Sequence, residues 1–105
     1  MRELHHIGIP TKTKQPNETH IAGGKLFITS SDNSPNKIEW LRFEPGSPMP
    51  EMLQTSTHIA YRVDDLKTEM RGHTVLMEPF SPMPGVTVAF VIEEGVPIEL
   101  MAVES

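Results

Sequence analysis

The chain of 105 residues contains no cysteine, which excludes disulfide bonds and thiolate metal ligands together. Any metal ion would therefore be held by nitrogen and oxygen donors. An apolar run long enough for a membrane span is also missing, and the first residues lack the apolar core of a signal peptide. We therefore expect a cytoplasmic protein with no membrane partner.

Basic runs are missing as well, and the net charge at pH 7 is -5, so the chain is not expected to bind nucleic acid. Its 37% hydrophobic and 22% charged residues are ordinary for a soluble globular protein. This length suits one domain, or two half-domains that share a core. We predict a single domain over 1–105, with a truncated first module over 1–50 and a second module over 51–105.

One short motif is present twice, because a histidine opens an alternating apolar stretch within Leu4–Pro10 and again within Ser56–Val63. The repeat predicts two equivalent half-domains that place one imidazole each, from His6 and His58, at the same point of a β-strand. Neutral imidazole binds most divalent metals. The histidine pair is therefore a starting point for a metal site.

The second half of the chain predicts the order strand, helix, strand, strand, strand. In the first of these strands, alternation places Ile59 and Val63 on the packed face. Asp64 or Asp65 can cap the helix, and Gly72 can end it. The predicted segments of this βαβββ unit are strands at His58–Val63, His73–Met77, Val86–Ile92 and Pro97–Val103, with a helix that contains Leu66 and Met70 on one face.

The first half predicts the same unit with a deletion. Lys25–Thr29 and Ile38–Phe43 form a predicted hairpin around the polar loop 30–36. Thr11–His20 is polar without a helical apolar period, so we interpret it as a loop with at most one helical turn. A short helix within Glu18–Gly23 stays open. The first module would then have lost most of its helix, and the loss of a strand as well is left open.

Two glutamates lie among aliphatic residues of predicted strands. Alternation places Glu99 on the face opposite Ile98 and Leu100, and Glu39 is in the same situation in the first half. Two histidines with one or two such carboxylates would make an octahedral or near-octahedral site suited to iron, manganese, cobalt, nickel or zinc. The alternative is that both glutamates are solvated on an exposed strand face.

The segment 38–105 resembles the vicinal-oxygen-chelate superfamily, which includes glyoxalase I, methylmalonyl-CoA epimerase, extradiol dioxygenases, fosfomycin-modifying enzymes and bleomycin-binding proteins. The resemblance rests on Phe43–Pro48, on Thr57–Leu66, which is the most specific piece, and on Pro97–Leu100. It is strongest to the epimerase branch, whose opening strand is similar to His5–Ile9. This resemblance implies an α+β fold in which paired βαβββ modules form a cup-shaped, mostly antiparallel sheet.

In such proteins the metal ligands come from the first and last strands of each module. Carried over to this chain, the resemblance implies that His6, His58 and Glu99 bind a divalent ion of cobalt, nickel, manganese, zinc or iron. The fourth ligand is open, because aligning the family on Glu44 and Pro45 puts Leu41 at its position. Glu39 lies two residues earlier on the same face, and a bulge or a shift of register would bring it in. We favour Glu39.

The implied activity is that of a metal-dependent epimerase, isomerase or lyase that removes a proton beside a metal-chelated carbonyl of a small molecule. Glu99 is the expected base. Arg62 shares a face with His58 and is expected to contact an anionic substrate. Trp40 and Tyr61 are expected to be core residues. A homodimer is expected because similar proteins pair their modules within or between chains.

Other functions stay open on the same sequence. Epimerases of this family also use a carboxylate on an early strand of the first module, and the strand at 25–29 offers none. A one-base isomerase or lyase is therefore an alternative, as is a non-catalytic binding protein of the bleomycin-resistance type. An extradiol dioxygenase, with Leu41 at the fourth position and a facial triad of ligands, is less expected since those enzymes are usually far longer.

Overall fold

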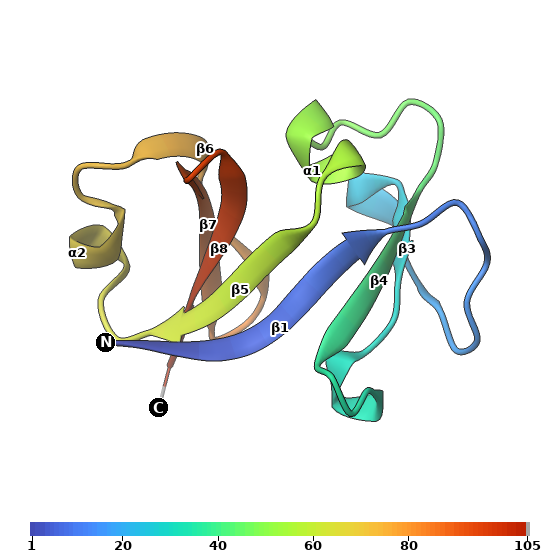
Figure 1. The fold of residues 1–105 in the computed structure, drawn as a ribbon, viewed down its shortest axis with the longest axis horizontal. Coiled ribbons are helices and arrows are strands. Elements are labelled where there is room, and N and C mark those ends of the chain that lie inside the picture. Colours follow the sequence, from blue (N-terminus) through green and yellow to red (C-terminus); the bar gives the residue numbers. More distant parts are fainter. Residues whose placement is uncertain (105) are drawn as a thin grey trace. The chain divides into compact units, whose positions relative to one another are not determined.

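The computed structural model describes residues 1–104, and its fold is α+β (Figure 1). The eight strands form one mixed sheet in the order β2-β3-β4-β1-β5-β8-β7-β6. Within 1–104, no helix has the length and apolar character needed to cross a membrane. The elements are β1 (Arg2–Pro10), β2 (Thr19–Ile21), the 3-10 helix η1 (Ala22–Gly24), β3 (Leu26–Ile28), the 3-10 helix η2 (Ser31–Asn33), β4 (Ile38–Phe43), α1 (Glu51–Thr55), β5 (His58–Val63), α2 (Leu66–Met70), β6 (Thr74–Met83), β7 (Val86–Glu93) and β8 (Val96–Val103).

The chain divides into two compact units. We call His6–Thr57 the first-module unit, and Met1–His5 together with 58–104 the second-module unit. Strand β1 supplies its first residues to the second-module unit and the rest to the first-module unit. The predicted α+β class with paired modules is confirmed, while the single domain with modules over 1–50 and 51–105 stays a prediction.

The second-module unit has the predicted order β5-α2-β6-β7-β8. Strand β5 pairs in parallel with β8, and β8 pairs antiparallel with β7, which pairs antiparallel with β6. Helix α2 starts where the Asp65 carboxylate accepts hydrogen bonds from the backbone N–H groups of Lys67 and Thr68. It ends before Gly72, whose φ of 81° favours glycine.

Strand β6 is longer than the predicted strand at 73–77 and continues to Met83. Its pairing with β7 has register shifts between Val75 and Met77, and again before Phe80 and before Met83. Because β6 ends the strand order, the prolines in it leave few ladder bonds broken, as is usual in edge strands. Alternation alone could not predict this length, since each bulge interrupts the period.

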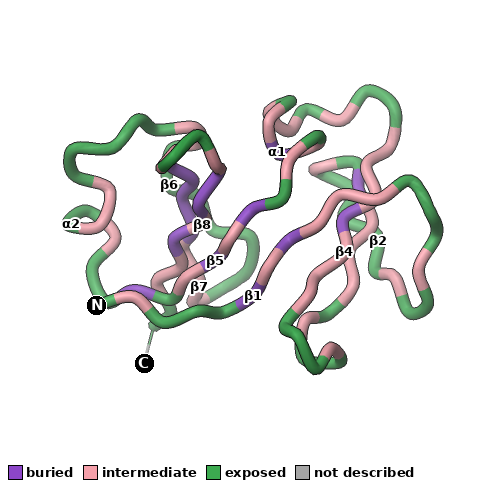
Figure 2. The backbone as a smooth tube through the Cα atoms, viewed as in Figure 1, coloured by how far each residue is buried: buried purple, intermediate pink, exposed green. Residues whose placement is uncertain are grey.

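The core of the second-module unit lies between its strands and α2. Val63 and Ile98 are 4% exposed and Val91 and Leu100 are fully buried. Figure 1 shows α2 to one side of β5, β8 and β7, and Figure 2 shows buried residues along β7 and β8. The predicted packed face of β5 is confirmed. The partly buried residues packed against this cluster are Ile59, Tyr61, Leu66, Met70 and Val96.

The first-module unit contains the strand that the sequence did not predict. Thr19–Ile21 forms β2, antiparallel to β3, and η1 follows at Ala22–Gly24. The interpretation of Thr11–His20 as a loop is therefore wrong at its end, and the module has kept its four strands. All three residues of β2 are exposed, so they carry no apolar alternation that could reveal a strand.

What the first module lacks within the described residues is a helix between its first two strands. Residues 11–18 have neither helix nor strand, whereas α2 follows β5 at the corresponding place. Strand β1 pairs in parallel with β4, with Ile7 opposite Ile38 and Ile9 opposite Trp40. The predicted deletion of most of the helix is thus borne out by the element order.

A second helix, α1, was not predicted from the sequence. It has five residues at Glu51–Thr55, just after the prolines of 48–50, and buries Leu53, which is 2% exposed. A helix of little more than one turn shows no helical apolar period. A single buried leucine in a proline-rich segment therefore gave no signal.

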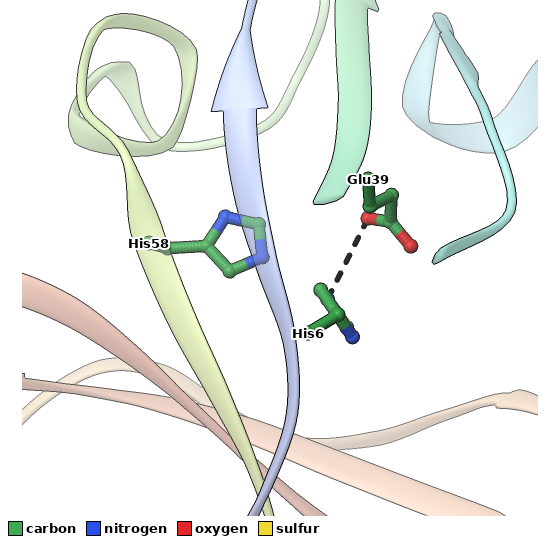
Figure 3. A group of neighbouring side chains, drawn as sticks. All are labelled: His6, Glu39 and His58. Carbon is green, nitrogen blue, oxygen red and sulfur yellow. Dashed lines mark ion pairs between the residues drawn. The ribbon is translucent and has the colours of Figure 1, made fainter. Parts of the chain in front are cut away.

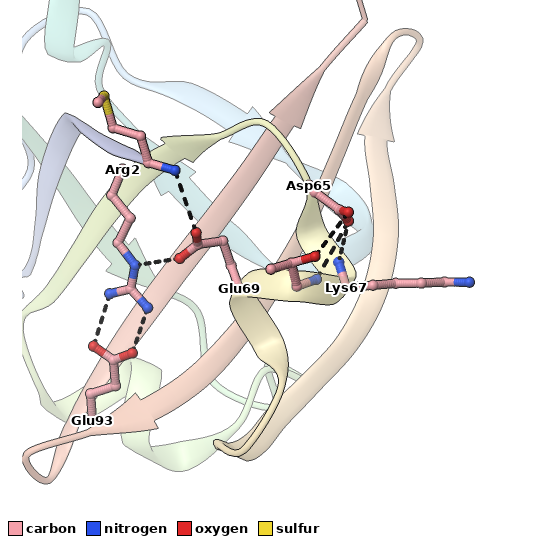
Figure 4. Close-up of polar contacts among 7 residues, drawn as sticks. Arg2, Asp65, Lys67, Glu69 and Glu93 are labelled. Carbon is pink, nitrogen blue, oxygen red and sulfur yellow. Dashed lines mark hydrogen bonds and ion pairs between the residues drawn. The ribbon is translucent and has the colours of Figure 1, made fainter.

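Arg2 ties the start of β1 to the rest of the second-module unit (Figure 4). Its guanidinium donates two hydrogen bonds to the Glu93 carboxylate, at 2.9 and 2.6 Å, and one to Glu69 of α2 at 2.8 Å. Hydrogen bonding to Glu93 raises the pKa of Arg2, and Arg2 lowers the pKa values of both carboxyl groups. The guanidinium also lies 5.3 Å from the ring centre of Tyr61.

Candidate metal centre

In the second-module unit, His58 and Glu99 form a pair on neighbouring parallel strands. His58 opens β5 and is 2% exposed. Glu99 lies on β8 opposite Ala60. The Nε2 atom of His58 is 3.2 Å from Oε1 of Glu99. The two side chains predicted as ligands in this module therefore meet on one face of the β5–β8 pair.

In the first-module unit, His6 and Glu39 form the corresponding pair. His6 on β1 is 3% exposed, and Glu39 lies on β4 opposite Gly8. The Nε2 atom of His6 is 3.7 Å from Oε1 of Glu39, as the dashed line in Figure 3 shows. Glu39 is thus placed beside the histidine rather than in solvent, and its side chain is only 19% exposed.

The two pairs have the same strand register. In each unit the glutamate lies opposite the residue two places after the histidine, which is Gly8 in one and Ala60 in the other. Both of these residues are buried, and a small residue there leaves space beside the carboxylate. By register, Glu39 is the counterpart of Glu99.

Leu41 has a different place. It lies opposite Pro10 and is 7% exposed among the core residues, and its counterpart in the second-module unit is Met101. The β1–β4 pairing runs without interruption from Ile7 to Pro10. Glu39 therefore reaches His6 without the bulge or shift of register that the sequence alignment required.

The donor atoms suit a divalent metal. His6 and Glu39 in the first-module unit, and His58 in the second-module unit, each offer a ligand atom of a kind that binds metal ions. Imidazole nitrogen and carboxylate oxygen bind zinc, iron, manganese, cobalt and nickel. The histidines are buried, unlike His20, whose side chain is 46% exposed while it pairs with Glu44 at 2.7 Å. Burial thus separates the candidate centre from an ordinary surface pair.

Phe90 is a residue of this region that the sequence reasoning missed. It lies on β7 directly opposite Glu99, is 5% exposed, and meets the His58 ring edge-on with ring centres 5.6 Å apart. The hairpin turn at Glu94 and Gly95 fixes the β7–β8 register. Counting back from that turn would have placed Phe90 beside Glu99.

The role expected of Arg62 as a substrate contact stays a prediction. Arg62 is exposed on β5, opposite Met101, so its guanidinium is accessible to an anion. Strand β3 consists of Leu26, Phe27 and Ile28 and supplies no carboxylate. Tyr61 packs against the core of its unit, as expected.

A scan against protein-family models gave no match, and a search of curated proteins found no similar sequence. Solved structures do match. A hypothetical protein from Bacillus halodurans C-125 gives a TM-score of 0.72 at 21% identity, covering 99% of this chain and 96% of that one. Methylmalonyl-CoA epimerase from Mycobacterium tuberculosis gives a TM-score of 0.64 at 17% identity, covering 97% and 88%.

These matches define the class of fold. The chain has the vicinal-oxygen-chelate fold, and the resemblance seen in its sequence is confirmed at that level. The second of these structures is an epimerase of that superfamily. At 17 to 21% identity the likeness concerns the fold alone, so the activity must be argued from the residues of this chain.

Proposed function

We propose that His6, Glu39, His58 and Glu99 together bind one divalent metal ion, and that the protein is a metal-dependent isomerase, epimerase or lyase of the vicinal-oxygen-chelate type. The observation that carries this proposal is the repeated register. A buried histidine with a glutamate 3.2 to 3.7 Å away occurs once in each unit, at equivalent positions of equivalent parallel strand pairs. A solvated surface pair would have no reason to repeat in this way.

A bound divalent metal would supply Lewis-acid polarisation of a carbonyl oxygen of the substrate. Glu99 would accept the proton from the carbon beside that carbonyl. Its carboxylate is suited to this role because its side chain is only 12% exposed, so bulk water has little access to it. Buried Phe90, opposite Glu99, would help to exclude water from the proton transfer.

Arg62 would contact an anionic group of the substrate at the exposed end of β5. Because β3 carries no carboxylate, we favour a reaction in which one base, Glu99, removes the proton. In an isomerisation Glu99 or the solvent then returns that proton to the substrate, and in an elimination Glu99 passes it to the departing group or to the solvent. One-base isomerisation and elimination both meet this condition, whereas two-base epimerisation needs a second carboxylate that this strand does not provide.

The first experiment measures metal binding. Protein purified without chelators should contain a divalent metal by mass spectrometry, and manganese, nickel, cobalt or zinc should raise its melting temperature. His6→Ala and His58→Ala should each weaken metal affinity by more than the roughly 10–100-fold that loss of an outer-shell partner costs. His20→Ala removes an exposed histidine paired with Glu44 and is the matched control, which should keep full affinity.

The second experiment measures proton exchange. The metal-loaded protein is incubated in heavy water with 2-substituted thioesters and 2-hydroxy ketones, and deuterium incorporation is followed by NMR. The wild type should exchange at least one of these substrates, and Glu99→Gln should not, while Glu44→Gln keeps the wild-type rate.

Two results would contradict the proposal at different points. If no divalent metal binds, or if His58→Ala leaves the melting temperature in the presence of metal unchanged, the metal site is wrong. If metal binds but no substrate across a broad panel exchanges, the protein is a metal-binding module rather than an enzyme of this type.

A further inference from the structure

The first-module unit contains a cavity of about 300 Å³ that the proposed metal centre does not use. Trp40 and Ile38 of β4 form part of its lining, and residues 15–17, 29–30 and 33–35 form the rest. Successive residues of a strand point to opposite faces. Trp40 and Ile38 therefore lie on the face of β4 opposite Glu39.

The missing helix explains why this cavity exists. By register, Trp40 is the counterpart of Leu100, since Ile9 lies opposite Trp40 as Tyr61 lies opposite Leu100. Leu100 is fully buried in the cluster on which α2 packs. Trp40 is only half-buried, because the loop at 11–18 stands where a helix would follow β1. The expectation that Trp40 is a core residue stays a prediction, because its burial is intermediate.

The polar side chains of the cavity are held in place by the backbone. Ser34 Oγ accepts hydrogen bonds from the N–H groups of Asn36 and Ile38. Thr29 Oγ1 accepts from the N–H of Trp40, and Ser30 Oγ accepts from that of Asp32. Each hydroxyl that accepts from the backbone keeps its own hydrogen to donate. The oxygen atoms of these donors are therefore held in place before a ligand binds, which reduces the entropy lost on binding.

The other residues that line the cavity indicate which kind of ligand it could bind. The side-chain amides of Gln15, Asn17 and Asn33 add donors and acceptors, and Pro16 and Pro35 add apolar surface. Among the described residues that line this cavity, none carries a formal charge. An ionic ligand would be poorly matched here, because its charge would lose water without gaining a partner.

We propose that this cavity binds a neutral, polyhydroxylated ring of the sugar type, with one face of the ring against the indole of Trp40. The C–H bonds of a sugar ring carry partial positive charge toward the electron-rich face of an aromatic ring. Its hydroxyl groups pair with the serine, threonine and amide groups around it. A volume of about 300 Å³ is at the lower end of the range for small-molecule sites.

The chain offers a direct probe, since Trp40 is its one tryptophan. Tryptophan emission is recorded during titration with glucose, galactose, N-acetylglucosamine and cellobiose, with glycerol and adenine as controls. At least one sugar should cause a saturable change, and glycerol should not. NMR chemical-shift changes of backbone amides should fall within 15–17 and 29–40.

Matched variants locate the binding site. Asn33→Ala should weaken sugar binding about tenfold, because an amide hydrogen-bond pair is lost. Asn36→Ala changes an exposed asparagine of the same loop that does not line the cavity, and it should bind as the wild type does. Trp40→Ala, followed by NMR, should abolish binding while its melting curve remains cooperative.

Three outcomes would overturn the proposal. The first is the absence of saturable binding for every sugar, and the second is tighter binding of adenine, which would show a site for flat aromatic ligands. The third is that Asn33→Ala and Asn36→Ala weaken binding equally. The His58→Ala variant should bind sugar as the wild type does. The sugar-binding result can therefore be interpreted even if the metal proposal fails.

Discussion

The two units of this protein place a histidine and a glutamate in the same register but cover their strands differently. In the second-module unit, α2 packs on a cluster in which Ile98 is 4% exposed and Leu100 is fully buried. In the first-module unit, the corresponding residues Ile38 and Trp40 are half-buried beside a loop. The register of the histidine and the glutamate is therefore the same with and without the helix that packs on the core of the second-module unit.

The difference shows that the two features have separate causes. Hydrogen bonds between parallel strands fix which residues face each other, so the His–Glu pairing needs only β1 with β4 and β5 with β8. Burial of the opposite face needs a further layer. A module can lose that layer and keep its histidine–glutamate pair.

The largest effect on the free energy of unfolding is expected from replacing one of two isoleucines at equivalent positions. Ile98 lies opposite Ile59 and is 4% exposed, while Ile38 lies opposite Ile7 and is half-buried. Ile98→Ala should lower the free energy of unfolding by about 3 kcal/mol, and Ile38→Ala by about 1 kcal/mol, because less apolar area is lost. Urea unfolding measures both. Equal losses would show that α2 contributes no more to the core than the loop at 11–18.

A smaller effect on stability is expected from replacing the two arginines whose side chains bind carboxylates distant in the sequence. Arg2 donates hydrogen bonds to two carboxylates, those of Glu69 and Glu93, whereas Arg42 donates its hydrogen bonds to that of Glu18. Arg2→Ala should cost about 2 kcal/mol, the usual worth of hydrogen bonds to charged groups, and Arg42→Ala should cost less. Lys67→Ala, an exposed change on α2, is the control. If Arg2→Ala has no more effect than this control, the contacts of Arg2 with Glu69 and Glu93 do not stabilise the second-module unit.

The smallest effect concerns acid pH in the first-module unit. Hydrogen bonding to Arg42 lowers the pKa of Glu18 from 4.5 to about 2. A lowered carboxyl pKa stabilises the folded state above pH 4.5, and this contribution is lost as the pH falls from 4.5 to about 2. Glu18→Gln should therefore make the free energy of unfolding less dependent on pH in that window. Arg42→Gln should flatten it similarly; an unchanged slope in both variants would contradict the role of this pair.

Much of the second-module unit could be predicted because its elements carry local signals. The strand at His58–Val63 alternates, and Asp65 and Gly72 mark the ends of α2. The tight turn near Gly95 marks the β7–β8 hairpin. Strand β2 and helix α1 could not be predicted, since three exposed residues and a single helical turn show no period.

The candidate site was predictable in kind but not in full. The repeat indicated His6 and His58, and the family resemblance implied Glu99. The choice between Glu39 and Leu41 stayed open, because the alignment puts Leu41 at the fourth ligand position while Glu39 lies on the same face. The β1–β4 register places Glu39 opposite Gly8, with its carboxylate 3.7 Å from His6. Parallel strands have no connecting turn that fixes their register locally, so this pairing could not be derived from the sequence pattern.

By itself, then, the sequence determined the chemistry: with no cysteine it restricted the donors to imidazole and carboxylate, and its repeat placed one histidine on the first strand of each module. Only the tertiary structure decided which glutamate meets each histidine and which strand faces are covered. The reason is that donor type and strand period are local properties of the chain. Register between distant strands and the layer that packs on them are set by contacts far apart in sequence.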